Sequence, residues 1–143
     1  MPDLQPTILL VEDNDEDVFL LRRALRKAGV ACSLQIATDG EEAIDYLAAK
    51  GKYSNRVLHP IPSLVLLDLK LPYVNGFEVL GWIATQSAWK ELRVIILTSS
   101  GEEPDRQKAE QFGIREYFLK PPTPELVTRI ARAVQAKTSA ATE

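Results

Sequence analysis

The sequence has few of the residues that build disulfide-rich or zinc-binding proteins. Its 143 residues include one cysteine, Cys32, and one histidine, His59, so an internal disulfide is excluded and a cysteine–histidine zinc site has too few ligands. No apolar run approaches the ~18 residues of a membrane-spanning helix, and no signal peptide precedes the first apolar segment. We therefore expect a cytoplasmic protein with no membrane partner.

Positive charge is also in short supply. The chain has 17 lysine and arginine residues against 20 aspartate and glutamate residues, a net charge of −3, and no basic stripe stands out, so nucleic acid is not an expected partner. A glycine-rich phosphate-binding loop is missing as well, which argues against nucleotide binding. The length and the hydrophobic content of 45% predict one globular domain over residues 1–143, with a core over about 6–136 and a polar tail over 137–143.

What the sequence does contain is a regular alternation of short apolar segments and helical patterns. The apolar segments predict strands over residues 7–11, 33–37, 64–68, 93–98 and 116–119. Helices are predicted over 15–28 and from about residues 39, 76, 104 and 124, whereas residues 50–63 have no period and predict a long loop. Five strands, each followed by a helix, predict an α/β fold with a doubly wound five-stranded parallel sheet and right-handed crossovers. For five such units the flavodoxin-like (βα)5 strand order 2-1-3-4-5 is favoured over the Rossmann-type order.

Polar side chains follow four of these strands at the points where the strands end. Glu12 and Asp13 follow the first strand and Asp68 ends the third, while Thr98 ends the fourth and Lys120 follows the fifth. The carboxyl ends of parallel strands lie at one edge of the sheet, and the predicted order places the first and third strands side by side. We therefore expect these five side chains to converge.

Such a convergence has a definite chemical use. Carboxylates a few ångströms apart repel one another, and a hard divalent cation such as Mg²⁺, which prefers oxygen ligands, relieves the repulsion. The ammonium group of Lys120 and the hydroxyl group of Thr98 would then be left to hold a phosphoryl group on the Asp68 carboxylate. The alternative for the acidic residues is a favourable interaction with a helix N-terminus, and this is our interpretation of Asp15 to Asp17.

Four stretches of the sequence together resemble a known family. They are LLVEDN (9–14), LVLLDLKLPYVNG (64–76), IILTSS (95–100) and YFLKPP (117–122). Their order and spacing are similar to those of the receiver domain of two-component response regulators, and the resemblance covers nearly the whole chain. It implies that Asp68 is the phosphoacceptor, and that Thr98 and Lys120 bind the phosphoryl oxygens.

The same resemblance implies a metal site and a switch. Mg²⁺ would be bound by Asp13, by Asp68 and by the backbone carbonyl of Lys70, with Glu12 acting at least partly through water. Tyr117 matches the aromatic residue that turns inward when the threonine moves toward the phosphate. The expected activity is that of a switch phosphorylated by a sensor histidine kinase, not that of an enzyme.

Within the family, the chain looks like the stand-alone regulators that work with bacterial phytochromes. This resemblance rests on the loop over 50–63, on the sequence DLKLP after the third strand and on the expected absence of an output domain. It makes a bacterial phytochrome the candidate kinase. It also implies a homodimer through the face formed by the fourth helix, the fifth strand and the fifth helix, near Phe112, Ile114 and Tyr117.

Two other functions compete with this interpretation. A phosphohydrolase of the haloacid-dehalogenase type also uses an aspartate and Mg²⁺, but it needs an acid two residues after the nucleophile, where this chain has Lys70. A degenerate receiver that serves as a constant scaffold would not need the complete set of acids, threonine and lysine.

Several local expectations can be compared directly with a structure. The Lys120–Pro121 peptide bond is predicted to be cis, because isomerisation of an X–Pro bond costs only ~0.5–1 kcal/mol and the family resemblance implies this geometry. Trp82 and Trp89 are expected to pack against the core, and His59 is expected to be exposed to solvent.

Overall fold

The computed structural model describes the backbone of residues 5–142 and the side chains as far as residue 135. The strands are β1 (Thr7–Val11), β2 (Ser33–Ala37), β3 (Leu64–Leu67), β4 (Arg93–Thr98) and β5 (Tyr117–Leu119). The α-helices are α1 (Asp15–Lys27), α2 (Gly40–Leu47), α3 (Gly76–Ala84), α4 (Glu103–Gln111) and α5 (Pro124–Thr142). Two short 3-10 helices are η1 (Gly51–Ser54) and η2 (Ser87–Trp89).

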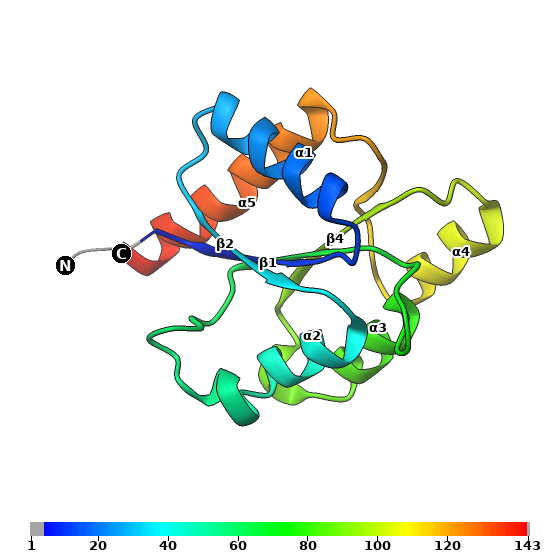
Figure 1. Cartoon of the computed structure of the whole chain (residues 1–143), viewed down its shortest axis with the longest axis horizontal. Helices are drawn as coiled ribbons and strands as arrows, with labels where there is room; N and C mark the ends of the chain where they lie inside the picture. The colour runs from blue at the N-terminus through cyan, green and yellow to red at the C-terminus, as the bar shows by residue number, and fades with distance from the viewer. Residues whose placement is uncertain (1–4, 143) are drawn as a thin grey trace.

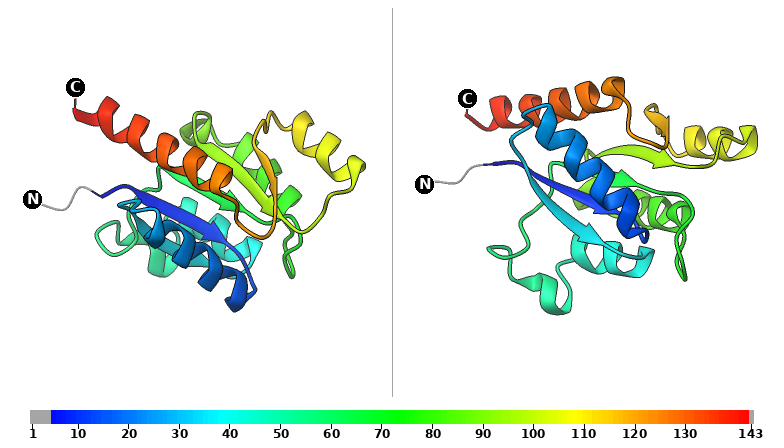
Figure 2. Two further views of the ribbon diagram at one scale, coloured as in Figure 1. Left: turned by 90° about the horizontal axis from the view of Figure 1, so that it is seen from above. Right: turned by 45° about the horizontal axis from the view of Figure 1, so that its top comes forward.

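The five strands form one parallel sheet in the order β2-β1-β3-β4-β5. This confirms the predicted flavodoxin-like fold. Helices α1 and α5 lie side by side on one face, and α2, α3 and α4 cover the other (Figures 1 and 2). Every residue of β1 and β3 is buried, because these two strands lie inside a sheet whose two faces are both covered.

Alternate residues of the central strands supply two separate cores. Leu9 and Leu67 belong to the core beneath α2 and α3, whereas Leu10 and Leu66 belong to the core beneath α1 and α5. This alternation follows from the period of two in a strand. The predicted inner face of α5, which consists of Val127, Ile130 and Val134, is buried in the second core.

The loops at the carboxyl ends of the strands are held by capped helices. Asn14 accepts a hydrogen bond from the backbone amide of Asp17 at the start of α1. Asn75 and Glu78 form a reciprocal capping box at the start of α3. These caps fix where the chain leaves the sheet after β1 and where it returns after β3.

Gly76 allows the loop after β3 to close tightly. A Cβ atom at this position would lie 2.5 Å from the carbonyl oxygen of Asp68 and 2.7 Å from the Cα atom of Leu69. The Gly76 amide donates a 3.1 Å hydrogen bond to the Leu69 carbonyl. The chain that follows Asp68 is therefore clamped against the first turn of α3 and has little freedom to move.

The segment over residues 50–63 is more ordered than its sequence predicts. It contains η1, and Tyr53 is buried. The expectation that His59 is exposed is wrong: its ring is half-buried, with its centroid 5.0 Å from that of Tyr53 and 5.8 Å from that of Tyr46. The Tyr46 hydroxyl donates a 2.7 Å hydrogen bond to the Pro60 carbonyl. This segment is held in place by aromatic packing against α2. Such packing leaves no hydrophobic period in the sequence of the loop, so the sequence alone does not predict it.

The remaining differences concern the ends of the elements. β5 begins at Tyr117, one residue later than predicted. α5 extends to Thr142, so the backbone of residues 137–142, predicted as a polar tail, continues the helix, and Glu143 lies outside the described residues. Trp82 and Trp89 pack against the core as predicted. In the part of the chain that the structure describes, no helix combines the length and the apolar character that crossing a membrane requires.

Candidate functional site

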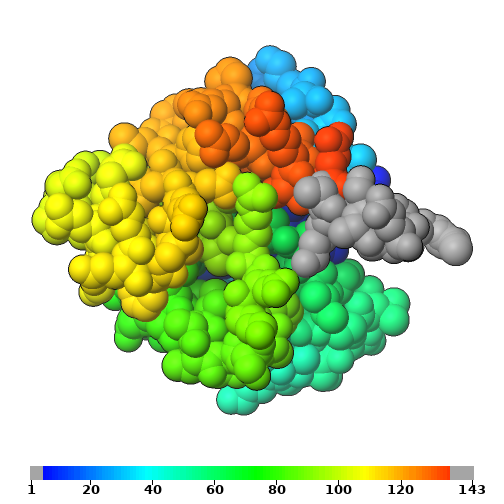
Figure 3. Space-filling model, turned by 180° about the vertical axis from the view of Figure 1, so that it is seen from behind, coloured from blue at the N-terminus to red at the C-terminus, as the bar shows by residue number. Residues whose placement is uncertain are grey.

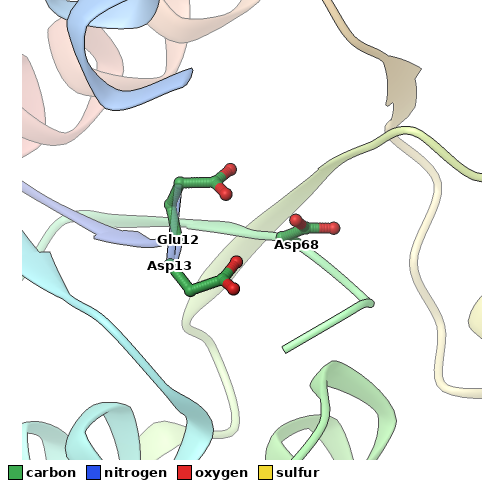
Figure 4. A group of neighbouring side chains, drawn as sticks. All are labelled: Glu12, Asp13 and Asp68. Carbon is green, nitrogen blue, oxygen red and sulfur yellow. The ribbon is translucent and has the colours of Figure 1, made fainter. Parts of the chain in front are cut away.

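Three carboxylates meet where β1 and β3 end. Val11 and Leu67 are register partners on these neighbouring strands, and the amide of Asp68 donates a 3.2 Å hydrogen bond to the Val11 carbonyl. Oxygen atoms of Glu12, Asp13 and Asp68 lie within 4.8 Å of one another (Figure 4). The predicted convergence of these residues is therefore present in the structure.

The three carboxylates differ in their exposure. Glu12 and Asp68 are buried, whereas Asp13 faces solvent. A cation held between them would meet protein oxygens on one side and water on the other, which suits the hydration that Mg²⁺ retains in proteins. The donor set contains only oxygen atoms and has no thiol or imidazole, so its chemistry fits a hard divalent cation.

Lys120 reaches into the same cluster from the end of β5. Its Nζ atom lies 2.8 Å from Glu12, 2.7 Å from Asp17 and 2.9 Å from Asp68. Its backbone amide donates a 2.9 Å hydrogen bond to the Thr98 carbonyl, and the predicted cis peptide bond between Lys120 and Pro121 is confirmed.

The contacts of Lys120 keep it charged. Burial alone would lower the pKa of its ammonium group, but hydrogen bonds to Asp17, Glu12 and Asp68 outweigh burial and raise it above the ordinary lysine range. The lysine is therefore an ammonium ion at any physiological pH. Even so, Glu12, Asp13, Asp17 and Asp68 together leave an excess of negative charge that one ammonium group does not balance.

The burial of Glu12 has the opposite effect on its carboxyl group. Desolvation raises the pKa of Glu12, the neighbouring Asp68 charge adds to this effect, and hydrogen bonds from Lys120 and Asn14 oppose it. A buried carboxylate whose protonation is favoured in this way gains from a nearby cation. This electrostatic imbalance favours metal binding at the cluster.

Asp17 is the member of the site that sequence reasoning missed. It lies in the first turn of α1 and was interpreted as a residue that interacts with the helix dipole. Its side chain instead pairs with Lys120, and only 31% of it is exposed. The available signal was its position in the first turn of the helix that directly follows Glu12 and Asp13, at the same edge of the sheet.

The Asp68 carboxylate is held on its other side by the loop that follows it. The backbone amide of Lys70 donates a 3.1 Å hydrogen bond to Asp68 Oδ1, and the Lys70 side chain is exposed to solvent. Thr98 is completely buried at the end of β4, next to β3 in the sheet. The roles of the Lys70 carbonyl in metal binding and of the Thr98 hydroxyl in phosphoryl binding stay predictions.

A ring of contacts links the site to the first turn of α4. Ser100 Oγ donates a 2.5 Å hydrogen bond to Asp105, and the Tyr117 hydroxyl donates a 2.8 Å hydrogen bond to the Ser100 carbonyl. The guanidinium group of Arg106 lies 4.4 Å from the centre of the Tyr117 ring, a distance typical of a cation–π interaction. Tyr117 is thus half-buried, and its hydroxyl points toward the loop between β4 and α4. Its role as the switch residue stays a prediction. Neither Asp105 nor Arg106 is predicted from the sequence as part of this ring of contacts.

The fold and the site together define a class of protein. A doubly wound sheet of five strands that ends in a buried aspartate, two further acids and a paired lysine is the arrangement of a receiver domain. The sequence matches the family described as response regulator receiver domain over residues 8–131. The chain therefore belongs to the response regulator receiver domain family.

Solved structures described as phytochrome response regulators are among the relatives of this chain. Response regulator Rcp1 of Synechocystis sp. (strain ATCC 27184 / PCC 6803 / Kazusa) is 36% identical over 113 residues, which are 79% of this chain and 75% of Rcp1. The structure of the bacteriophytochrome response regulator AtBRR has a TM-score of 0.80 and 38% identity, over 93% of this chain and 94% of AtBRR. The structure of the phosphorylated cyanobacterial phytochrome response regulator RcpA has a TM-score of 0.76 and 31% identity, over 94% of this chain and 91% of RcpA. These likenesses confirm the family and the phytochrome-associated relatives expected from the sequence.

Proposed function

We propose that the protein is a response regulator switch that accepts a phosphoryl group on Asp68 from the histidine of a sensor kinase. The observation that carries this proposal is the position of Asp68, which is buried and lies against Lys120 and two further carboxylates. In the transfer, an Asp68 oxygen would attack phosphorus as the bond from phosphorus to the histidine nitrogen breaks. We expect no substrate turnover, so the protein would act as a switch and not as an enzyme.

The residues of the site divide into two groups in this reaction. Mg²⁺ would be bound by Asp13, Asp68 and the Lys70 carbonyl, with Glu12 acting partly through water, and would neutralise charge on the phosphoryl oxygens. Lys120 and Thr98 would bind the same oxygens from the other side. The relative Rcp1 has been crystallised in a Mn²⁺-bound form, which has a TM-score of 0.75 and 31% identity over 92% of both chains. The phosphorylated structure of RcpA supports the same chemistry.

Phosphorylation would be transmitted through Thr98 and Tyr117. A phosphoryl oxygen that draws the Thr98 hydroxyl toward it changes the packing around Ser100, whose amide lies 3.4 Å from Thr98 Oγ1 and whose carbonyl accepts the Tyr117 hydroxyl. The equilibrium between two arrangements of α4 would then shift. Members of this family work with sensor histidine kinases, and the phytochrome-associated relatives make a bacterial phytochrome our candidate kinase. A cytoplasmic location and the absence of a nucleic-acid partner stay predictions.

The direct test of the proposed function is the Mg²⁺ dependence of phosphorylation. Incubation with acetyl phosphate and Mg²⁺ should add the mass of one phosphoryl group to the intact protein. The same incubation with a chelator should add none, because the metal-binding carboxylates repel an anionic donor when no cation is present. Intact mass spectrometry measures both samples. A mass gain that persists in the chelator would contradict the metal requirement.

We further propose a homodimer through α4, β5 and α5. β5 is an edge strand, and an exposed edge favours pairing or coverage by another chain. Phe112 and Leu119 expose 37% and 44% of their surface on this side of the molecule, whereas Ile114 packs against the core and Tyr117 is turned inward. Leu119 is therefore the apolar contact we expect at the interface, because Phe112 lines a separate groove between α3 and the end of α4.

Sedimentation velocity at micromolar concentration tests the dimer. We expect a larger fraction of dimer after phosphorylation, because the proposed interface contains α4, whose arrangement phosphorylation would change. Leu119→Ser should decrease the fraction of dimer several-fold. The control is Val57→Ser, which changes an exposed apolar residue of the 50–63 loop, outside the proposed interface, and it should leave the fraction unchanged. Monomers at all concentrations in both states would rule out the dimer.

The exposed side chain of Lys70 should prolong the life of the phosphorylated state. Water must approach phosphorus opposite the Asp68 oxygen, and a long cationic side chain two residues after Asp68 can cover the phosphoryl group without activating water. Ser100, two residues after Thr98, would border the path of the water on the other side. Its side chain is small and does not block that path, and its hydroxyl is bound to Asp105. We expect loss of phosphate from the wild type over minutes or longer, and a several-fold faster loss from Lys70→Ala. Timed mass spectra measure the rates, and an equal or slower loss from the variant would show that Lys70 is not a shield.

A further inference from the structure

A groove lies at the opposite end of the sheet from Asp68. It runs between the end of α3 and η2 on one side and the end of α4, the start of β5 and α5 on the other, and its volume is about 760 Å³. Figure 3 looks onto this face, where the green segment from α3 to β4 borders the yellow-to-orange segment from α4 to α5. The volume is within the range of ~300–1,000 Å³ that is usual for ligand sites in proteins.

The floor of the groove is apolar. Leu80 and Ile83 of α3 form its buried base, and the rings of Trp89 and Phe112 stand partly exposed on its two sides. Phe112 exposes 37% of its surface. Aromatic side chains that are partly exposed in a concave surface are typical contact points for a partner.

The walls of the groove carry an excess of positive charge. Lys90, Arg93, Arg115 and Arg129 line it, with Glu116 as the one acidic residue, so the lining has a net charge of +3. The other thirteen basic and nineteen acidic residues of the chain give a net charge of −6. Positive charge is thus concentrated in this groove on a protein that is otherwise acidic.

The single carboxylate leaves two of these cations available. Glu116 accepts two hydrogen bonds from Arg93, at 3.0 and 2.8 Å, and one from Arg129 at 3.3 Å. Burial alone would raise the pKa of Glu116, but these hydrogen bonds outweigh burial and lower it. Among the described residues, Lys90 and Arg115 have no acidic partner, and both are exposed. The groove therefore combines an apolar floor with two unneutralised cations on its rim.

We propose that this groove binds an acidic segment of a partner protein, a peptide with one or two large apolar side chains between carboxylates. The apolar side chains would pack on Trp89 and Phe112, and the carboxylates would pair with Lys90 and Arg115. Charge complementarity of this kind selects partners and accelerates their encounter. The proposal does not depend on the phosphorylation of Asp68.

Other occupants fit the groove less well. A nucleic acid is held by a row of cations along its backbone, whereas this groove offers two unpaired cations and an apolar floor. A second copy of the chain would have to bring an acidic segment into the groove, a heterologous contact that builds rings or open filaments and not the two-fold dimer proposed above.

The groove is also separate from the phosphoacceptor pocket. Arg93 begins β4 at the groove, and Thr98 ends the same strand at the pocket, so the two sites lie at opposite ends of β4. Substitutions at Lys90 and Arg115 should therefore leave Mg²⁺-dependent phosphorylation intact. This separation allows the two proposals to be tested independently.

The test measures the binding of a fluorescein-labelled peptide, Glu-Asp-Leu-Trp-Glu-Asp-Leu-Glu, by fluorescence anisotropy. We expect a Kd of roughly 10–100 µM, as is usual for a small polar interface. The double variant Lys90→Glu/Arg115→Glu should bind at least tenfold more weakly, and Phe112→Ser several-fold more weakly. Arg23→Glu/Lys50→Glu reverses the same two charges at exposed positions outside the groove and should bind like the wild type.

Three results would overturn the proposal. The first is a lack of specific peptide binding, seen either as no binding at millimolar protein or as an equal loss of affinity in the two double variants. The second is equal or tighter binding of a single-stranded DNA octamer, which would assign the groove to nucleic acid. The third is a self-association of the protein alone that Lys90→Glu/Arg115→Glu abolishes, since a second copy would then be the occupant. Circular dichroism and the mass gain with acetyl phosphate confirm that each variant is folded and intact at its pocket.

Discussion

Replacement of Asp68 by asparagine is expected to abolish phosphorylation by acetyl phosphate completely. The amide of asparagine is too weak a nucleophile to attack phosphorus, yet it has nearly the same shape as the carboxylate and can still accept the hydrogen bond from the Lys70 amide. The variant should therefore remain folded while its chemistry is lost. Intact mass spectrometry after incubation with Mg²⁺ and acetyl phosphate measures the result.

Asp45→Asn is the matched control for this experiment. Asp45 lies on α2, is partly buried, and lies outside the acidic cluster at the ends of β1 and β3. It should gain one phosphoryl group as the wild type does. A mass gain in Asp68→Asn equal to that of the control would place the phosphate on another residue and refute the assignment.

Replacement of Lys120 by methionine should give the largest loss of stability. Methionine fills a similar volume but leaves Glu12 and Asp68 as buried carboxylates without their counter-ion. Removing one partner from a buried ion pair lowers the free energy of unfolding by about 3–5 kcal/mol. For a domain of this size that corresponds to a decrease in Tm of about 10 °C or more. Thermal unfolding in a chelator, followed by circular dichroism, measures the change.

The loss of stability in Lys120→Met should depend on pH, and the sign can be worked out. Burial already raises the pKa of Glu12 in the folded protein, so its contribution to stability is present at low pH and is lost as the pH rises through the folded pKa. Without Lys120, the pKa of this carboxyl group rises further. The deficit should therefore be largest near neutral pH and should decrease toward pH 5.

A second substitution separates electrostatics from packing. Glu12→Gln added to Lys120→Met removes one of the uncompensated charges and should recover part of the lost Tm. Addition of Mg²⁺ to Lys120→Met should also recover part of it, through the same relief of repulsion. If neither change raises the Tm, the loss comes from packing at Lys120 and not from unpaired carboxylates.

The sequence predicts the fold well where a single local rule decides the outcome. Apart from Thr7 at the start of β1, β1 and β3 consist of leucine, isoleucine and valine, because both faces of these strands are covered. Ligands bind at the carboxyl ends of parallel strands, and this rule predicts from the sequence alone that Glu12, Asp68 and Lys120 lie together. The contacts of Lys120 with both acids confirm that reasoning.

The features that sequence reasoning missed are contacts between elements far apart in the chain. The ion pair of Asp17 with Lys120 joins residues 103 positions apart, and a helix-dipole role explains an acid in a first turn equally well without it. The ring of Ser100, Asp105, Arg106 and Tyr117 depends on how α4 is oriented against β5. A hydrophobic pattern identifies the buried side of a helix, but it does not show which polar groups of the helix meet polar groups of the neighbouring strand.

If Asp68 accepts a phosphoryl group as proposed, the three contacts of Lys120 require the pocket to exchange partners. An ammonium group has three N–H donors, and here Glu12, Asp17 and Asp68 take up all three. A phosphoryl oxygen that approaches Lys120 must therefore displace a carboxylate. Asp17 is the one most readily given up, since 31% of its side chain is exposed, against 3% and 5% for Glu12 and Asp68, and water can replace the lost hydrogen bond. The helix that carries Asp17 would then be untethered from the sheet edge, so that α1 as well as α4 would respond to the proposed phosphorylation of Asp68.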